Sequence, residues 1–373
     1  MPDYSIFDVK VSIITPLHIG NGRILLNYYD YDIRDGKTWR INEDALLDAQ
    51  DVDDPQQAEL LARTPPADLL RPEDFKEEAG KFFRYVIQGT PRATGEGAEL
   101  HEQIKDPLDR LYLPGTSLKG SLRTAIAWYA WQAKNLQPDA RKLGNSPRWA
   151  ASEYERMLLG PNPNKDLLRA LHVGDSKPLD ASRLMLVNVR VVNLDGTVSA
   201  PVEVEAIKPD TVFDMQIKFD WQLFSEWAKG AGLRLQGEEW LRRLSAVVNQ
   251  HSQQRIAIEQ QRFEELPSAR RVASFYRTLA QSSLPKDSFL LQLGWGTGWD
   301  DKTFGSRLKT DEQFMEHIIR QFRMARGKRQ RGDPFPKSRR LAIAYGRDAN
   351  GRVVSEAPAY PLGWVFVEMT EKR

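Results

Sequence analysis

Stretches of alternating apolar and polar residues are separated along this chain by longer segments with helical periodicity. Residues 7–13 alternate Phe, Val, Val and Ile with Asp, Lys and Ser, and residues 213–219 alternate Phe, Met, Ile and Phe with Asp, Gln and Lys. Such alternation is typical of strands with one buried face, whereas helical patterns dominate residues 221–279. Strands and helices interleaved in this way predict an α+β fold with mainly antiparallel sheets.

Further elements follow from the same patterns and from turn residues. We expect a hairpin over residues 25–41 with Asp35 and Gly36 at its turn, followed by an acidic helical excursion from Asp44 to about Lys81. Residues 89–102 lack periodicity and predict a loop or a protruding finger. A second helical stretch is expected near residues 147–159, and further strands over residues 184–192, 289–293, 341–345 and 364–369.

Residues 113–123 have the sequence Leu-Pro-Gly-Thr-Ser-Leu-Lys-Gly-Ser-Leu-Arg. The Pro-Gly pair predicts a turn, after which Thr116 or Ser117 can cap a helix. An apolar stripe at helical spacing then predicts a helix over residues 117–134. The stripe consists of Leu118, Leu122, Ile126 and Tyr129.

The start of this helix carries unusual residues. Lys119 and Arg123 are cations where the helix dipole favours anions, and Gly120 costs roughly 1 kcal/mol against Ala. A bound phosphate would accept hydrogen bonds from backbone N–H groups and neutralise both cations. Gly120 would let a nucleic-acid strand approach the helix backbone. The alternative is a solvated helix end. Because Lys119 precedes Gly120, the Walker pattern is absent and nucleotide hydrolysis is not expected here.

A second glycine-rich segment follows the apolar run of residues 289–293. Three glycines alternate there with larger residues, in the order Gly294, Trp295, Gly296, Thr297, Gly298 and Trp299. The pattern lacks the spacing of a dinucleotide fingerprint. Large aromatic rings on a loop are suited to stacking on bases, which favours RNA binding. The alternative is that both Trp rings fold back onto the core.

Composition limits the remaining classes of function. The 373 residues, of which 41% are hydrophobic, suffice for two packed domains. No stretch approaches the ~20 apolar residues of a membrane span, and no signal peptide precedes the first strand. The absence of Cys excludes disulfides and thiolate metal sites, and the five His residues show no ligand spacing. We therefore expect a cytoplasmic protein without metal or other cofactor.

Charge is distributed unevenly, although the net charge is only +2. Residues 302–340 contain 12 Lys and Arg but 4 Asp and Glu, whereas residues 43–78 contain 12 Asp and Glu but 3 Lys and Arg. The basic tract is expected to lie partly on a helix with Phe314, Ile318 and Phe322 facing inward. Beside the glycine and tryptophan loop, this tract favours an electrostatic track for a nucleic-acid backbone over an ordinary solvated face.

Three motifs occur in an order and spacing that resemble the RAMP superfamily of CRISPR-associated proteins. They are Thr-Pro-Leu-His-Ile-Gly-Asn-Gly at residues 15–22, the segment 113–123 and the loop 294–298. Further segments are similar to one branch, the terminal backbone subunit of type III-A (Csm) effector complexes, or fifth Csm subunit. They lie at residues 171–176, 205–213, 335–340 and 361–364, so the similarity spans nearly the whole chain.

The resemblance implies two RRM-like (ferredoxin-like) domains with helical insertions. We expect these at residues 1–195, with the acidic helical insertion at about 43–110, and at residues 196–373. It also implies a non-catalytic subunit that caps the effector backbone, binds the 3′-proximal part of the guide RNA and supports guide maturation and antiviral defence. The implied partners are guide and target RNA, the other subunits, especially the repeating backbone subunit, and host nucleases that trim the guide.

The candidate RNA-binding residues combine cations, aromatic rings and glycines. Lys119 and Arg123 would hold phosphates, either Trp would stack on a base, and the cluster at residues 337–340 would extend the charged path. Such contacts tolerate any guide sequence. The full set is His18, Gly20, Gly22, Ser117, Lys119, Gly120, Arg123, Gly294, Trp295, Gly296, Gly298, Trp299, Lys302, Lys337, Arg339 and Arg340.

Two other functions stay open at this point. Some RAMP relatives cut RNA with a His as general acid or base, which makes His18 a candidate, and Asp30 and Asp32 lie where the repeating backbone subunit carries its catalytic Asp. A His between Leu17 and Ile19 at a strand end is more often structural, and the Tyr-Tyr-Asp-Tyr-Asp setting departs from that subunit's pattern. The second alternative is a purely protein–protein capping subunit that uses the acidic excursion.

Overall fold

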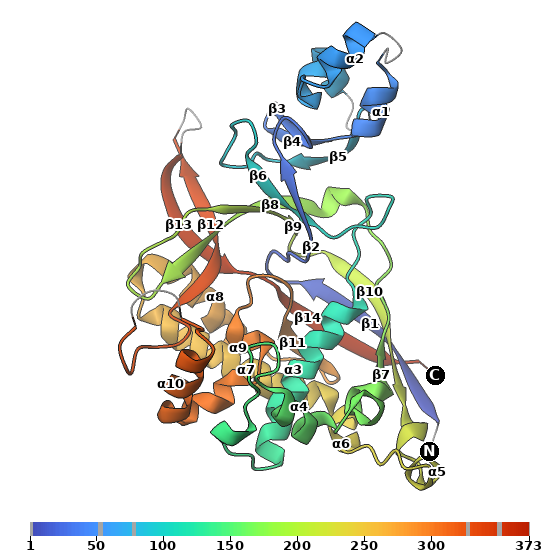
Figure 1. Cartoon of the computed structure of the whole chain (residues 1–373), viewed down its shortest axis with the longest axis vertical. Coiled ribbons are helices and arrows are strands. Elements are labelled where there is room, and N and C mark those ends of the chain that lie inside the picture. The colour runs from blue at the N-terminus through green and yellow to red at the C-terminus, as the bar shows by residue number, and fades with distance from the viewer. Residues whose placement is uncertain (1–2, 51–54, 77–79, 326–328, 349–352, 373) are drawn as a thin grey trace.

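Three sheets follow one another along the long axis of the molecule, and most helices gather at one end of it (Figure 1). The structure is a computed structural model that describes residues 3–50, 55–76, 80–325, 329–348 and 353–372. The small sheet with α1 and α2 forms the opposite end. The predicted α+β class with mainly antiparallel sheets is confirmed.

A five-stranded sheet joins the first strand of the chain to its middle and its end. All its strand pairs are antiparallel. Its order is β11 (Ser288–Gln292), β14 (Trp364–Glu371), β1 (Tyr4–Ile13), β10 (Val212–Asp220) and β7 (Leu171–Val173). Val9 and Val11 of β1 are buried whereas Asp8 and Lys10 are exposed, as the alternation predicted. The division into residues 1–195 and 196–373 stays a prediction.

The buried face of this sheet packs against two long helices, α3 (Gly115–Ala133) and α7 (Leu244–Glu264). The predicted stripe is confirmed, since Leu118, Leu122 and Ile126 are fully buried. The predicted cap is wrong, because the helix begins two residues earlier and its N-cap is Pro114. The Gly115 N–H instead donates to Asp175 Oδ1 at 2.7 Å, so a carboxylate already occupies the helix start.

Two further sheets build the middle and the far end. The six-stranded sheet has the order β13 (Val353–Pro361), β12 (Ser338–Arg347), β8 (Leu184–Asn193), β9 (Val202–Ile207), β6 (Glu99–Gln103) and β2 (Gly20–Leu26), and β6 and β9 run parallel. The three-stranded sheet contains β3 (Tyr31–Arg34), β4 (Lys37–Ile41) and β5 (Phe83–Gln88). The turn at Asp35 and Gly36 is confirmed, with φ of 52° and 73°.

Short helices complete the fold. The acidic excursion contains α1 (Glu43–Asp48) and α2 (Pro55–Leu61), and the helical stretch expected near residues 147–159 is formed only in its second half. That half is α4 (Ser152–Leu159), and the others are α5 (Glu226–Gly230), α6 (Glu238–Arg242), α8 (Arg270–Ala280), α9 (Trp299–Lys302) and α10 (Glu312–Gln321). No helix within the described ranges combines the length and the apolar character needed to cross a membrane.

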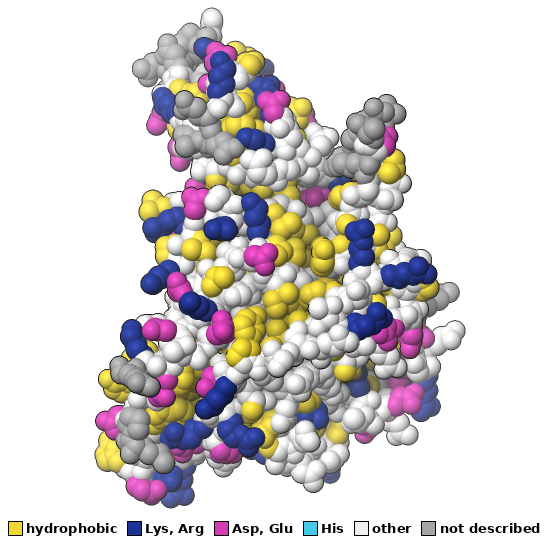
Figure 2. All heavy atoms as spheres, turned by 180° about the vertical axis from the view of Figure 1, so that it is seen from behind, with side chains coloured by type: hydrophobic (Ala, Val, Ile, Leu, Met, Phe, Trp, Pro, Cys, Tyr) yellow, Lys and Arg dark blue, Asp and Glu magenta, His cyan; other side chains and the backbone are white. Residues whose placement is uncertain are grey.

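The surface opposite to the view of Figure 1 has a mixed character. A band of hydrophobic side chains crosses its middle, and side chains of both charge signs are scattered around that band (Figure 2). Clustered apolar surface rimmed by polar residues is typical of a protein contact, whereas a nucleic-acid surface is predominantly basic. This face is therefore better suited to a protein partner than to RNA.

Candidate nucleic-acid interface

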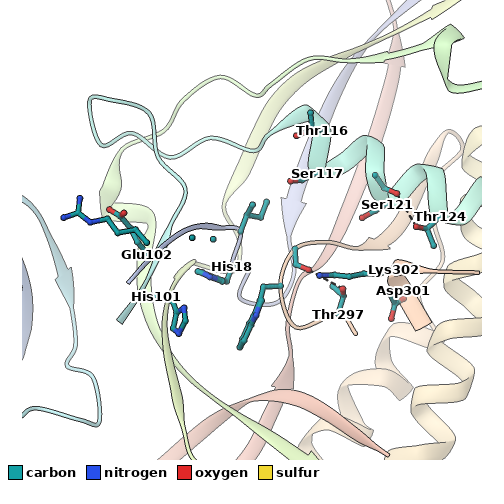
Figure 3. A pocket seen from close by; sticks show the side chains of 17 residues that line it. His18, His101, Glu102, Thr116, Ser117, Ser121, Thr124, Thr297, Asp301 and Lys302 are labelled. Atoms are coloured by element: carbon teal, nitrogen blue, oxygen red, sulfur yellow. Dashed lines mark hydrogen bonds between the residues drawn. The ribbon is translucent and has the colours of Figure 1, made fainter. Parts of the chain in front are cut away.

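Segments that lie far apart in the sequence line one groove of about 530 Å³. They are residues 18–23, which include the start of β2, one face of α3, and the loop 294–302, with His101 and Glu102 contributed by β6 (Figure 3). The groove thus brings together the three motifs that the sequence singled out. The predicted residues that line it are His18, Gly20, Gly22, Ser117, Gly120, Gly294, Trp295 and Lys302.

Close backbone contact joins two of these segments. The Trp295 N–H donates to the His18 carbonyl oxygen at 2.8 Å. Gly294 has φ of 77°, and a Cβ there would lie 2.5 Å from the same oxygen. Glycine is therefore required by the packing of the two segments, before any RNA is considered. Gly296 packs against Leu362 in a similar way, whereas Gly298 has open space beside it.

His18 is buried beneath the groove and held in one tautomer. Its Nδ1 lies 2.6 Å from the Glu205 carbonyl oxygen, which can only accept, so Nδ1 carries the proton. Burial lowers the pKa of His18 to about 4, although the hydrogen bond to Glu205 opposes this shift. The ring of Trp295 meets the imidazole edge to face at 5.8 Å. A neutral, packed imidazole of this kind fits a structural role better than proton transfer.

Glu205 supports this arrangement from below and was missed as a site residue by sequence reasoning. Glu205 is only 1% exposed. Its carboxylate accepts hydrogen bonds from Tyr85 Oη at 2.7 Å, from Lys105 Nζ at 2.6 Å and from the Gln103 N–H at 3.0 Å. One buried carboxylate thus ties β9 to β5 and to β6 while its carbonyl holds His18. The motif at residues 205–213 was the available signal, but nothing local indicated its partners.

The face of α3 that lines the groove is small and polar. It presents Thr116, Ser117, Gly120, Ser121 and Thr124, which follow helical spacing (Figure 3). A Cβ at Gly120 would meet no atom within 4 Å, so this side is open. Ser121 and Thr124 were not predicted as site residues, although their spacing from Ser117 was a usable signal.

Lys119 and Arg123 are absent from the groove lining. Arg123 pairs with Asp166 at 2.8 Å and with Glu155 at 3.2 Å. Burial lowers the pKa of Lys119, and the positive charge of Arg123 adds to this shift, whereas Asp166 opposes it. The structure therefore places both predicted phosphate ligands beside the groove, and it satisfies Arg123 internally.

Two cations on the loop side remain available. The Lys302 side chain is exposed and extends into the groove (Figure 3). Arg340 lies with its guanidinium 4.9 Å from the ring centroid of Trp295. Within the described residues, neither side chain has a carboxylate partner, and burial together with the charge of Arg340 lowers the pKa of Lys302. An anion would relieve the repulsion between these two groups.

Arg339, the neighbour of Arg340, lies in a buried ion cluster. Its guanidinium contacts Glu259 at 2.6 Å and Asp300 at 3.0 Å. Arg255 adds contacts to Glu259 at 2.8 Å and to Asp301 at 3.2 Å. The cluster joins α7, α9 and β12 directly beneath the groove loop. Arg339 therefore anchors the loop and does not face the groove.

The remaining predicted residues are also engaged within the protein. Trp299 packs edge to face on Phe335 at 5.1 Å, which agrees with the alternative that its ring folds back. Lys337 forms an ion pair with Asp333. In the basic tract, Arg329 pairs with Glu316 at 2.7 Å. Arg320, Arg323 and Arg331 are exposed, and Arg326 and Lys328 lie outside the described residues.

Neither aspartate considered for catalysis lines the groove. Asp30 pairs with Arg23 at 2.6 Å and accepts from the Leu26 N–H at 2.8 Å. Asp32 lies on β3, and burial raises its pKa. Across the described parts of the chain, no group of three or more His, Asp or Glu residues is arranged to hold a metal ion.

Comparison with known protein families matches residues 10–299 to the RAMP superfamily. That span is more than half of the chain and contains the segments that form the groove, apart from Asp301 and Lys302 at its end. The chain belongs to the RAMP superfamily. The resemblance to this superfamily, predicted from the sequence, is thereby confirmed.

Individual relatives within the superfamily carry the name Csm5. "CRISPR system Cms protein Csm5" of Streptococcus thermophilus is 28% identical over 242 residues, which are 58% of this chain and 64% of the relative. The protein of that name from Mycobacterium tuberculosis (strain H37Rv) is 28% identical over 234 residues, 59% of this chain and 55% of the relative. In both, the matched part is less than two thirds of the relative's length.

Solved structures extend the likeness to nearly the whole chain. A chain in the cryo-EM structure of a Csm–crRNA–target RNA ternary complex of a type III-A CRISPR-Cas system matches with a TM-score of 0.66 and 25% identity, covering 97% of this chain and all of the other. The crystal structure of T. onnurineus Csm5 matches with a TM-score of 0.63 and 22% identity, covering 95% and 99%. The predicted resemblance to the fifth Csm subunit and its two ferredoxin-like domains is thus confirmed.

Proposed function

We propose that this chain is a non-catalytic, RNA-binding subunit that caps the backbone of a type III-A CRISPR effector complex. The 3′-proximal part of the guide RNA occupies the groove between α3 and the loop 294–302. One observation carries the proposal: three distant family motifs line a single groove into which Lys302 extends, and Arg340 lies next to it over the ring of Trp295. Within the described residues, neither cation has a carboxylate partner. Guide and target RNA and the repeating backbone subunit are the expected partners, and host nucleases would trim the guide beyond the cap.

The chemistry of the lining supports RNA over a small substrate. The lining combines hydroxyl groups of α3 with the Lys302 cation on the loop side, and it also contains the carboxylates of Glu102 and Asp301. Hydroxyls and cations bind phosphate and ribose without reading bases, as a subunit that serves many guides requires. The lowered pKa of His18 and the ion pair of Asp30 support the non-catalytic assignment. The hydrophobic band of Figure 2 offers a surface for neighbouring subunits.

The test is a paired removal of cations. Lys302→Ala with Arg340→Ala should weaken binding of a guide-like RNA by about 1.5–3 kcal/mol per charged hydrogen bond lost. The slope of log Kobs against log salt should fall by roughly 0.7 for each phosphate contact. Fluorescence anisotropy over a salt series measures both quantities.

The matched control removes the same charge elsewhere. Lys10→Ala with Lys177→Ala changes two exposed lysines that line a separate hollow on the five-stranded sheet. We expect this pair to leave the affinity and the slope close to those of the wild type. Equal losses in both double variants would show that the binding is a general charge effect and would contradict the groove.

A further inference from the structure

The groove adjoins a second cavity farther along α3. This cavity has a volume of about 650 Å³ and lies between α3, α4 and the segment around α9 and α10. Gly120, Thr124 and Lys302 line both hollows. Its volume falls within the range of about 300–1,000 Å³ that is typical of small-ligand sites. The two hollows therefore adjoin along one face of α3.

The lining of the cavity is aromatic, in contrast to the hydroxyl-rich groove. Trp149, Tyr154, Trp299, Phe304 and Phe322 contribute rings to it. The Tyr154 hydroxyl is already engaged, because it donates to the Asp139 carbonyl oxygen at 2.8 Å. Trp149 is 57% exposed, which is unusual for so large an apolar side chain beside a ready-made cavity. Such a ring is available to stack on a planar ligand.

Positive charge marks the entrance. Lys302 is shared with the groove, and the Arg148 guanidinium lies 5.0 Å from the centroid of the Trp149 ring. Arg123 and Glu155 also line the cavity, but they pair with each other at 3.2 Å. Among the residues that the structure describes, neither Lys302 nor Arg148 has a carboxylate partner, and both are exposed. An aromatic interior with these two cations is complementary to a flat base attached to a phosphate. An apolar protein side chain would use the interior and leave the cations unpaired.

We propose that this cavity receives one nucleobase of the RNA strand as the strand leaves the groove over Gly120. The base stacks on Trp149, and Lys302 holds the phosphate that connects it to the strand in the groove. This inference rests on the proposed function, since it extends the same RNA path by one nucleotide. It predicts that one position of the bound RNA contributes to affinity through its base, whereas the others contribute through the backbone.

The experiment removes bases from the RNA instead of atoms from the protein core. A set of guide-like RNAs, each with one abasic nucleotide, is titrated against the full-length protein and its Trp149→Ala variant. One abasic position should weaken binding to the wild type roughly tenfold, in line with the loss of one base–aromatic stack. In Trp149→Ala the penalty at that position should shrink to the level of the others. Trp227→Ala, which removes another exposed Trp on α5, should retain the wild-type profile.

Photo-cross-linking supplies an independent measurement. A 4-thiouridine at the sensitive position should cross-link to peptides from residues 143–154 or 299–308. Equal penalties at every position, or a cross-link only to peptides outside those two segments, would overturn the base pocket. If Lys302→Ala with Arg340→Ala loses RNA binding while the abasic penalties are uniform, the groove stands and only this inference falls. If that double variant binds RNA like the wild type, the proposed function falls with it.

Discussion

Adjacent residues of β12 should respond to substitution in opposite ways. Arg339 has a side chain that is 10% exposed and contacts both Glu259 and Asp300, whereas Arg340 is exposed over Trp295. Burial alone would raise the pKa of Glu259, but Arg339 and Arg255 lower it to about 2, so this carboxylate is charged in the fold. Removal of Arg339 takes one ion-pair partner from the buried carboxylate of Glu259 and one from that of Asp300. Loss of one member of a buried ion pair typically costs 3–5 kcal/mol.

We therefore expect Arg339→Ala to lower the free energy of unfolding by about 3–5 kcal/mol. Arg340→Ala loses only an exposed cation–π contact and should cost less than about 1 kcal/mol. Urea unfolding measures both values, provided that the slope m is unchanged between variants. The effects on RNA binding should be the reverse of the effects on stability. The slope of log Kobs against log salt should fall in Arg340→Ala, and it should stay unchanged in Arg339→Ala under conditions in which that variant is folded. Equal unfolding midpoints for the two variants would refute the buried cluster.

Two further outcomes test the site. Gly294→Ala should destabilise the fold by at least about 1 kcal/mol, because Gly294 has a positive φ and a Cβ there would meet the His18 carbonyl oxygen. Gly120→Ala should stabilise the fold by up to about 1 kcal/mol, because a Cβ at this helical position has open space. Thermal unfolding of the two variants measures both effects. Unfolded His18 binds a proton below about pH 6.5, whereas folded His18 does so only below about pH 4. The free energy of unfolding should therefore decrease as the pH is lowered from about 6.5 to about 4. In urea titrations, His18→Asn should make that decrease smaller by about 3 kcal/mol. An identical pH profile in His18→Asn would contradict the buried neutral imidazole.

Local patterns predicted the elements well, because burial of one face imposes a period on the sequence. The stripe Leu118, Leu122 and Ile126 fixed α3 to within two residues, and alternation located β1 and β10. Strands such as β9 and β13 were not predicted. In β9 the sequence does alternate, with Glu203 and Glu205 between apolar residues, but the run is short and both glutamates are buried. The polar positions therefore do not mark an exposed face.

The candidate site was predicted in its segments more than in its side chains. Successive residues of a strand point to opposite faces, so Arg339 and Arg340 could not both face RNA. Which of them is buried depends on Glu259, 80 residues away in sequence. On α3 the sequence likewise cannot show which polar face meets a ligand. One polar face carries Lys119 and Arg123, and another carries Ser117, Ser121 and Thr124. Only the position of Asp166 and of the facing loop decides which face is the groove.

The buried cluster gives a physical reason why a chain with a net charge of +2 would bind an anion at the proposed site. Lys302 ends α9 directly after Asp300 and Asp301, and these carboxylates are held by Arg339 and Arg255. The backbone that carries Lys302 is therefore fixed before any ligand arrives, and only its exposed side chain must be ordered on binding. Pre-organisation of this kind reduces the entropy lost on association, so two well-placed cations can replace a broadly basic surface. In the proposed RNA groove, the affinity would then depend on a cluster whose arginines, Arg255 and Arg339, do not line the groove.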